Sequence, residues 1–112
     1  MEDYIYKITV EIDDDKVKRL NQHDLDAVYQ TVRDTFTQQD FHDVSEGKQL
    51  IFTMMPHKDA FSNVGIVTTT LYDSWLGTYL KSMMWYKKIN SDKEEVEDLL
   101  KCFKRFYEKY GK

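Results

Sequence analysis

The sequence predicts an α+β fold: an antiparallel sheet with the ferredoxin-like order β-α-β-β-α-β, followed by an added C-terminal helix. Residues 4–12 alternate side chains with the period of a strand, and residues 96–110 carry an apolar stripe with the period of a helix. The segments between them follow one another in the order that a split βαβ arrangement requires. In this arrangement both helices cover one face of the sheet, and the first and third strands are central.

The composition is that of one domain, which we expect to span residues 1–112. Hydrophobic residues make up 41% of the 112 residues and charged residues 32%, enough to fill one core. No run approaches the ~20 apolar residues of a membrane span, and the N-terminus lacks the basic and apolar regions of a signal peptide. The single cysteine, Cys102, permits no internal disulfide, so we expect a cytoplasmic protein.

The first strand is predicted over Tyr4–Ile12, where β-branched and aromatic residues alternate. One face is expected to be buried, and it carries Tyr4, Tyr6, Ile8, Val10 and Ile12. The other face carries Ile5, Lys7, Thr9 and Glu11. Consecutive acids disfavour a strand, so we expect Asp13–Asp15 to end it in a solvated loop.

The first helix is predicted to begin near Gln22. Asn21 suits the N-cap position, and Leu20 and Leu25 occupy the two positions of a hydrophobic staple. Its apolar stripe at helical spacing is Leu25, Val28, Tyr29, Val32 and Phe36. Residues 37–40 are expected to end this helix.

A β-hairpin is predicted next, from residues 41–45 through a turn at Gly47 to residues 48–55. The segment 50–55 is apolar on both faces, and Pro56 closes the strand. A strand that is apolar on both faces is typical of a sheet covered on both sides.

Residues 59–73 carry two conflicting signals. Ala60, Val64, Val67 and Leu71 recur at the spacing of a helix face, whereas the many β-branched residues favour a strand. We favour the helix, because the period is sustained over this length. A loop at 75–77 and a strand over 79–88 complete the predicted sheet, and the middle of that strand is again apolar on both faces.

The C-terminal helix has the clearest signal in the sequence. The segment 91–94 reads Ser-Asp-Lys-Glu, a capping box, and acids lie near its start while cations lie toward its end. Its predicted stripe is Val96, Leu99, Leu100, Phe103, Phe106, Tyr107 and Tyr110. Gly111 suits the position after the helix.

The second face of the predicted sheet needs a cover, which the C-terminal helix, a second copy or a partner protein would supply. We therefore expect an interface on this face and on the C-terminal helix. Its candidate residues are Ile5, Lys7, Ile51, Thr53, Met83, Trp85, Phe103, Phe106 and Tyr110.

No motif of the sequence predicts a catalytic, metal or cofactor site. Asp13–Asp15 lacks the spacing of a calcium loop, and His23, His42 and His57 lack the paired spacing of zinc ligands. Cys102 lies past the middle of the predicted helix, where the helix dipole does not lower a thiol pKa, so we expect a core-flanking residue. No glycine-rich phosphate loop or nucleophile elbow occurs.

The opening stretch Tyr4–Val17 resembles the start of short, uncharacterised bacterial proteins. The resemblance implies a bacterial origin, and it brings no activity or site with it.

Together these observations favour a non-enzymatic accessory domain that binds a protein partner or a second copy of itself. A different class remains open: a small enzyme with a pocket lined by Tyr, His and Asp. RNA binding on the sheet face is less favoured, because the net charge is −4 and the RNA-binding strand motif is absent. A binding protein should show an exposed apolar surface, and an enzyme should show perturbed histidines or carboxylates in a cleft.

Overall fold

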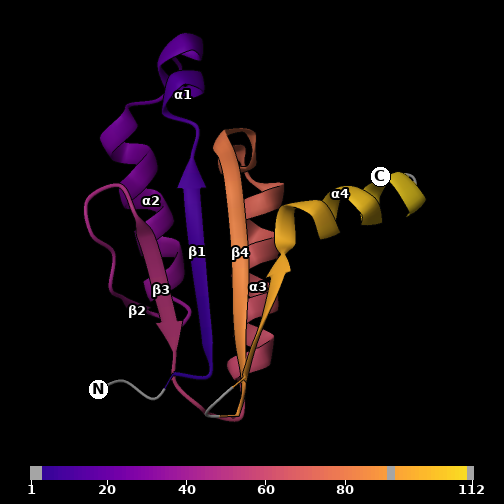
Figure 1. Cartoon of the computed structure of the whole chain (residues 1–112). Helices are drawn as coiled ribbons and strands as arrows, with labels where there is room; N and C mark the ends of the chain where they lie inside the picture. Colours follow the sequence, from indigo (N-terminus) through magenta and orange to yellow (C-terminus); the bar gives the residue numbers. More distant parts are fainter. Residues whose placement is uncertain (1–3, 91–92, 111–112) are drawn as a thin grey trace.

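The computed structural model describes residues 4–90 and 93–110, which form a five-stranded antiparallel sheet and four α-helices (Figure 1). The strands are β1 (Tyr6–Ile12), β2 (His42–Asp43), β3 (Leu50–Met54), β4 (Leu80–Asn90) and β5 (Lys93–Asp98). The helices are α1 (Asp14–Leu20), α2 (Leu25–Thr37), α3 (Ala60–Asp73) and α4 (Leu99–Tyr110), and a 3₁₀ helix, η1, spans Trp75–Tyr79.

The strands lie in the order β2-β3-β1-β4-β5. The predicted positions of β1 and β3 inside the sheet are confirmed. A fifth strand that the sequence analysis did not predict follows β4, so the order differs from that of a four-stranded sheet. β1 therefore lies at the centre, where it pairs with β4 from Tyr6 to Ile12 and with β3 from Tyr6 to Val10.

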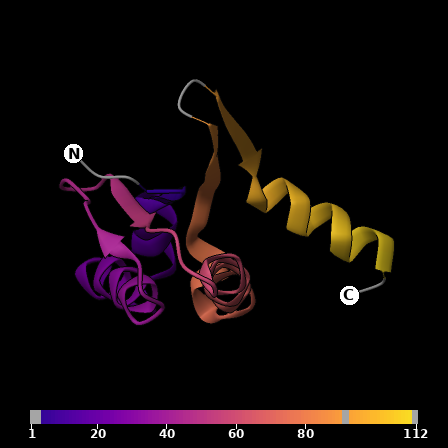
Figure 2. The same ribbon diagram turned by 90° about the horizontal axis from the view of Figure 1, so that it is seen from below.

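The core lies between the sheet and the helices α2 and α3, which sit side by side on the same face (Figure 2). Alternation places Ile8, Val10 and Ile12 of β1 on this covered face, and all three are buried. Opposite them, α2 buries Val28, Val32 and Phe36, while Phe36 stacks on Phe52 with ring centroids 4.1 Å apart. The helix favoured over 59–73 is confirmed as α3, and its predicted face, Ala60, Val64, Val67 and Leu71, is buried.

The segment after β1 differs from the prediction. Asp13–Asp15 do not form the expected loop. Asp13 is instead the N-cap of the short helix α1, because its carboxylate accepts a hydrogen bond from the Lys16 backbone N–H at 3.1 Å. Asn21 ends this helix in the left-handed conformation, and Asp24 is the N-cap of α2. The sequence analysis was wrong here, because an Asn suits both ends of a helix and only the chain path decides between them.

The C-terminal element also differs from the prediction. Residues 93–98, expected to be helical, form β5, and the helix begins only at Leu99. Pairing with β4 overrides the helical signal, since Lys87 faces Glu95 and forms an ion pair with Glu97 at 2.8 Å. The predicted capping residues 91 and 92 lie outside the described residues.

No helix within the described residues is long and apolar enough to cross a membrane.

Candidate functional site

The sheet has one covered face and one open face. The helices α1, α2 and α3 lie on the same side of the sheet, whereas alternation points other side chains away from them (Figure 2). The strand register joins those side chains into two rows. We call them the open face: Thr53, Lys7, Tyr86 and Val96 in one row, and Ile51, Thr9, Met84 and Asp98 in the other.

The open face is partly apolar and nearly balanced in charge. Val96 is 52% exposed, and Ile51, Met84 and Tyr86 are half-buried. The Lys7 ammonium lies 4.6 Å from the centre of the Tyr86 ring, where the electron-rich face of the ring attracts a cation. This surface can bind another surface by contact and cation–π attraction, but it brings together no set of titratable groups suited to catalysis.

Six of the nine predicted interface residues lie in β1, β3 or β4 or, for Ile5, directly before β1. Lys7, Ile51 and Thr53 lie on the open face, although Thr53 is itself buried. Ile5 is half-buried and packs against the core. Met83 lies on the covered face instead, fully buried opposite Val10.

Trp85 also lies on the covered face, opposite Ile8 and only 7% exposed. Placing Met83 and Trp85 on an exposed interface was therefore wrong. The strand is apolar on both faces, so its sequence cannot say which set of alternate residues faces the core. The register with β1 decides it: Met84 and Tyr86 face outward.

The remaining predicted residues lie on α4, which does not cover the open face. Leu99 and Leu100 are buried in the core cluster, and Phe103 stacks on Tyr72 of α3 with ring centroids 4.7 Å apart. The helix then runs outward beyond the sheet (Figures 1 and 2), and Phe106 is 54% exposed. The side chain of Tyr110 lies outside the part of the chain that the structure describes.

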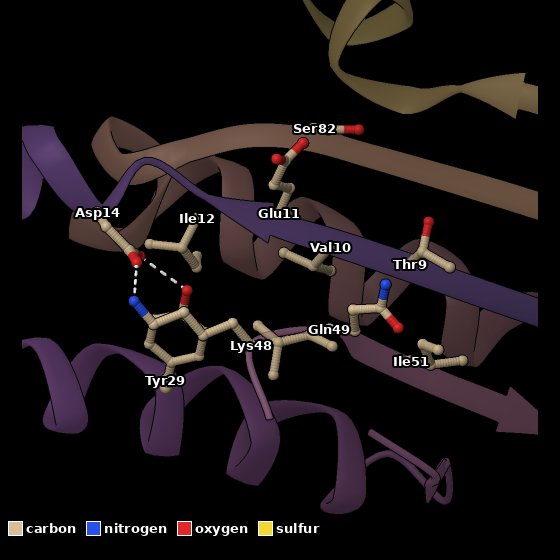
Figure 3. A pocket seen from close by; sticks show the side chains of 11 residues that line it. Thr9, Val10, Glu11, Ile12, Asp14, Tyr29, Lys48, Gln49, Ile51 and Ser82 are labelled. Atoms are coloured by element: carbon tan, nitrogen blue, oxygen red, sulfur yellow. Dashed lines mark hydrogen bonds and ion pairs between the residues drawn. The ribbon is translucent and has the colours of Figure 1, made fainter. Parts of the chain in front are cut away.

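A hollow of about 540 Å³ lies at the end of β1 (Figure 3). The last pair between β1 and β3 is Val10 with Leu50, and β1 continues for two residues beyond it. Because β3 does not pair with this end of β1, a notch is left beside the turn at Lys48. The lining residues that bear polar side chains are Thr9, Glu11, Asp14, Tyr29, Lys48, Gln49 and Ser82. A volume of this size is within the range of small-molecule sites, roughly 300–1,000 Å³.

Three polar groups of this hollow bond one another. The Asp14 carboxylate accepts a hydrogen bond from the Tyr29 hydroxyl at 2.7 Å and another from the Lys48 ammonium at 2.6 Å (Figure 3). Burial raises the pKa of Asp14, but these two hydrogen bonds outweigh it and leave the pKa below its ordinary value. Burial and the bond to Asp14 raise the pKa of Tyr29. Both pKa values thus move away from neutrality, contrary to what acid–base catalysis requires.

None of the three histidines lines this hollow. His23 stacks on Trp75 with ring centroids 4.1 Å apart, and its Nδ1 lies 2.9 Å from the Tyr79 hydroxyl. Nε2 of His57 lies 3.1 Å from Sδ of Met54, and His42 is exposed on β2. Among the described residues, no three His, Cys, Asp or Glu side chains are grouped to hold a metal ion.

Cys102 is half-buried on α4, where its thiol donates a hydrogen bond to the Glu97 carboxylate at 3.0 Å. That bond and burial raise the thiol pKa, which favours the unreactive protonated form.

Sequence reasoning missed the Asp14–Tyr29–Lys48 cluster. These residues come from an expected loop, an expected core stripe and an expected turn, and no spacing links them. The chain was also compared with protein-family models, curated proteins and solved structures, and none of them matched it.

Proposed function

We propose that this chain is a non-enzymatic binding domain that engages a protein partner, or a second copy of itself, through the open face and α4. One observation carries the proposal: the helices α1, α2 and α3 lie on one side of the sheet, and α4 extends outward instead of covering the other. Half-buried apolar side chains remain on the open face, and Phe106 is exposed on α4. Exposed apolar surface of this kind is typical of protein interfaces.

The enzyme alternative has weaker support. The hollow at the end of β1 is lined by Tyr29 and Asp14, but its lining residues include no histidine. Burial and the bond to Asp14 raise the pKa of Tyr29, while the bonds from Lys48 and Tyr29 hold the pKa of Asp14 below its ordinary value despite burial.

RNA binding also has weaker support. The ferredoxin-like sheets that bind RNA stack bases on aromatic side chains amid cations. β1 and β3 present Lys7, Thr9, Ile51 and Thr53 on the open face, none of them aromatic, and β4 presents Tyr86 there. The net charge of −4 adds repulsion from phosphate.

For the fold, we propose that β1 to β4 are a ferredoxin-like unit to which β5 and α4 were added. The order β2-β3-β1-β4 supports this, because the two inner strands are the first and the third. We also propose a cytoplasmic location, which the single, unreactive cysteine supports.

Two charge-introducing variants and one control test the proposed function. Met84→Glu alters the open face, Phe106→Glu alters α4, and Phe61→Glu alters an exposed aromatic residue of α3 that belongs to neither surface. The partner is isolated on the immobilised chain, purified and titrated against each variant by calorimetry. Light scattering at several concentrations shows whether the partner is a second copy of the chain.

We expect the control to keep the affinity of the unaltered chain and at least one surface variant to lose it. Equal affinities for all variants would contradict the proposal, as would a strictly monomeric chain that retains no partner.

A further inference from the structure

We infer that α4 binds an acidic, amphipathic helix of a partner protein. This inference rests on the proposed function and names the chemistry of the partner. It starts from the division of α4 into two parts. The first part is held by the body through Leu99, Leu100 and Phe103, whereas Phe106 and its polar neighbours are exposed beyond it.

The charge of α4 is strongly positive. Its twelve residues carry four cations and one acid, Glu108, for a net charge of +3. The cations border the apolar stripe on both sides. Leu100 and Phe106 lie at its two edges; Lys104, one turn after Leu100, borders the first edge, and Lys109, three residues after Phe106, borders the second. An apolar stripe bordered by cations complements a helix whose apolar stripe is bordered by acids.

A shallow hollow at the foot of α4 extends this surface. It has a volume of about 360 Å³ between the end of α3, the start of β4 and α4. Tyr72, Leu80 and Leu100 supply its apolar wall, and Lys81 and Lys104 are the cationic residues that line it. Lys81 approaches Glu11 only at 3.8 Å, with both side chains largely exposed, so this weak pair leaves it able to meet a carboxylate of the partner.

A second copy of the chain does not fit this surface. Two α4 helices packed together would bring two charges of +3 into contact, which is unfavourable. The acidic helix of the chain, α2, exposes Asp26, Gln30 and Asp34 but no large apolar residue for Phe106 to contact. The occupant therefore comes from a different protein.

An anionic membrane fits less well than a helix. Membrane-surface helices bind through a wide apolar face, and three large apolar residues of α4 are already packed against the body.

The test titrates the full chain with labelled synthetic peptides by fluorescence anisotropy. One peptide is a helix with a leucine stripe bordered by glutamates, and its twin has lysines in place of the glutamates. Lys104→Glu combined with Arg105→Glu replaces two cations of α4 by acids. As the control, Lys18→Glu combined with Arg19→Glu makes the same change of charge on α1. Vesicles of phosphatidylcholine with phosphatidylserine form a second arm.

We expect the acidic peptide to bind at least about tenfold more tightly than its basic twin, and more weakly as salt is added. Reversal on α4 should remove this preference, and reversal on α1 should preserve it. Equal binding of both peptides, an unchanged preference after reversal on α4, or binding to vesicles alone would overturn the inference.

These outcomes are separable from the proposed function. A natural partner that is lost with Met84→Glu but kept with the α4 reversal would refute the acidic-helix inference and leave the binding domain standing. A chain that loses no partner with any of these variants would refute both.

Discussion

At the scale of single residues, three side chains from distant segments form a polar cluster at the end of β1. Asp14 accepts hydrogen bonds from Tyr29 and Lys48 and thereby joins α1, α2 and the turn before β3. Tyr29 appears in the sequence only as one position of an apolar stripe, and Asp14 only as one of three acids. Their contact could not be predicted, because it depends on the notch at the end of β1.

The Asp14 cluster gives the stability of the fold a defined pH dependence. Folding lowers the pKa of Asp14 from its ordinary value of 3.8, so the unfolded chain binds more protons in acid. The stabilisation is therefore present above pH 3.8 and is lost as the pH falls through the lowered pKa. Asp14→Asn should reduce the free energy of unfolding at neutral pH, with a deficit that shrinks in acid.

Urea titrations at several pH values measure this, and Tyr29→Phe serves as the companion variant. Because Tyr29→Phe loses one hydrogen bond, its free energy of unfolding should be lower by about 0.5–1.5 kcal/mol at neutral pH. A deficit of Asp14→Asn that stays constant down to the lowest pH would contradict the role assigned to the carboxylate.

The reactivity of Cys102 is the second prediction at this scale. Because the bond to Glu97 raises the thiol pKa, alkylation by iodoacetamide at pH 8 should be slower than for an unstructured peptide thiol. Glu97→Gln should accelerate alkylation several-fold, whereas Glu95→Gln, an exposed neighbour on the same strand, should not. If Cys102 of the unaltered chain reacted as fast as the peptide thiol, this description of its surroundings would be contradicted.

At the scale of elements, the sequence predicts what period and local chemistry determine. β1, the hairpin of β2 and β3, α3 and β4 were all predicted, and the buried face of α3 was correct at four positions. β5 was not predicted, because Lys93–Asp98 carries no strand pattern and acquires its structure from Lys87 and its neighbours on β4. The same dependence on strand pairing misplaced Met83 and Trp85.

Two glycines provide the prediction at this scale. A Cβ at Gly77, in η1, would collide with the backbone carbonyl oxygen of Tyr72, whereas a Cβ at Gly65, within α3, would meet no described atom within 4 Å. Gly77→Ala should therefore destabilise the chain by about 1–3 kcal/mol. Gly65→Ala should stabilise it by about 0.5–1 kcal/mol, because alanine favours the helix.

Urea unfolding of both variants gives the two values. Equal effects, or a stable Gly77→Ala chain, would contradict the close approach between η1 and the end of α3.

At the scale of the whole molecule, charge is distributed unevenly along the chain. Residues 1–50 carry a charge of −6 and residues 51–112 a charge of +2, and within the second part β4 and α4 each carry a net charge of +3. The sequence predicted two strands that are apolar on both faces, and Ile51 of β3 and Met84 of β4 do point away from the covered face. The sequence could not indicate that α4 would leave the open face uncovered, because the direction of a terminal helix depends on where its first turn packs.

The open face and α4 are the two surfaces proposed to bind a partner. The most direct measurement is the dissociation constant of the purified partner for the unaltered chain, Met84→Glu, Phe106→Glu and the control Phe61→Glu. The account predicts that at least one of the first two variants weakens binding by about tenfold or more, as expected for a residue at the centre of an interface, while the control leaves it unchanged. Four equal dissociation constants would contradict it.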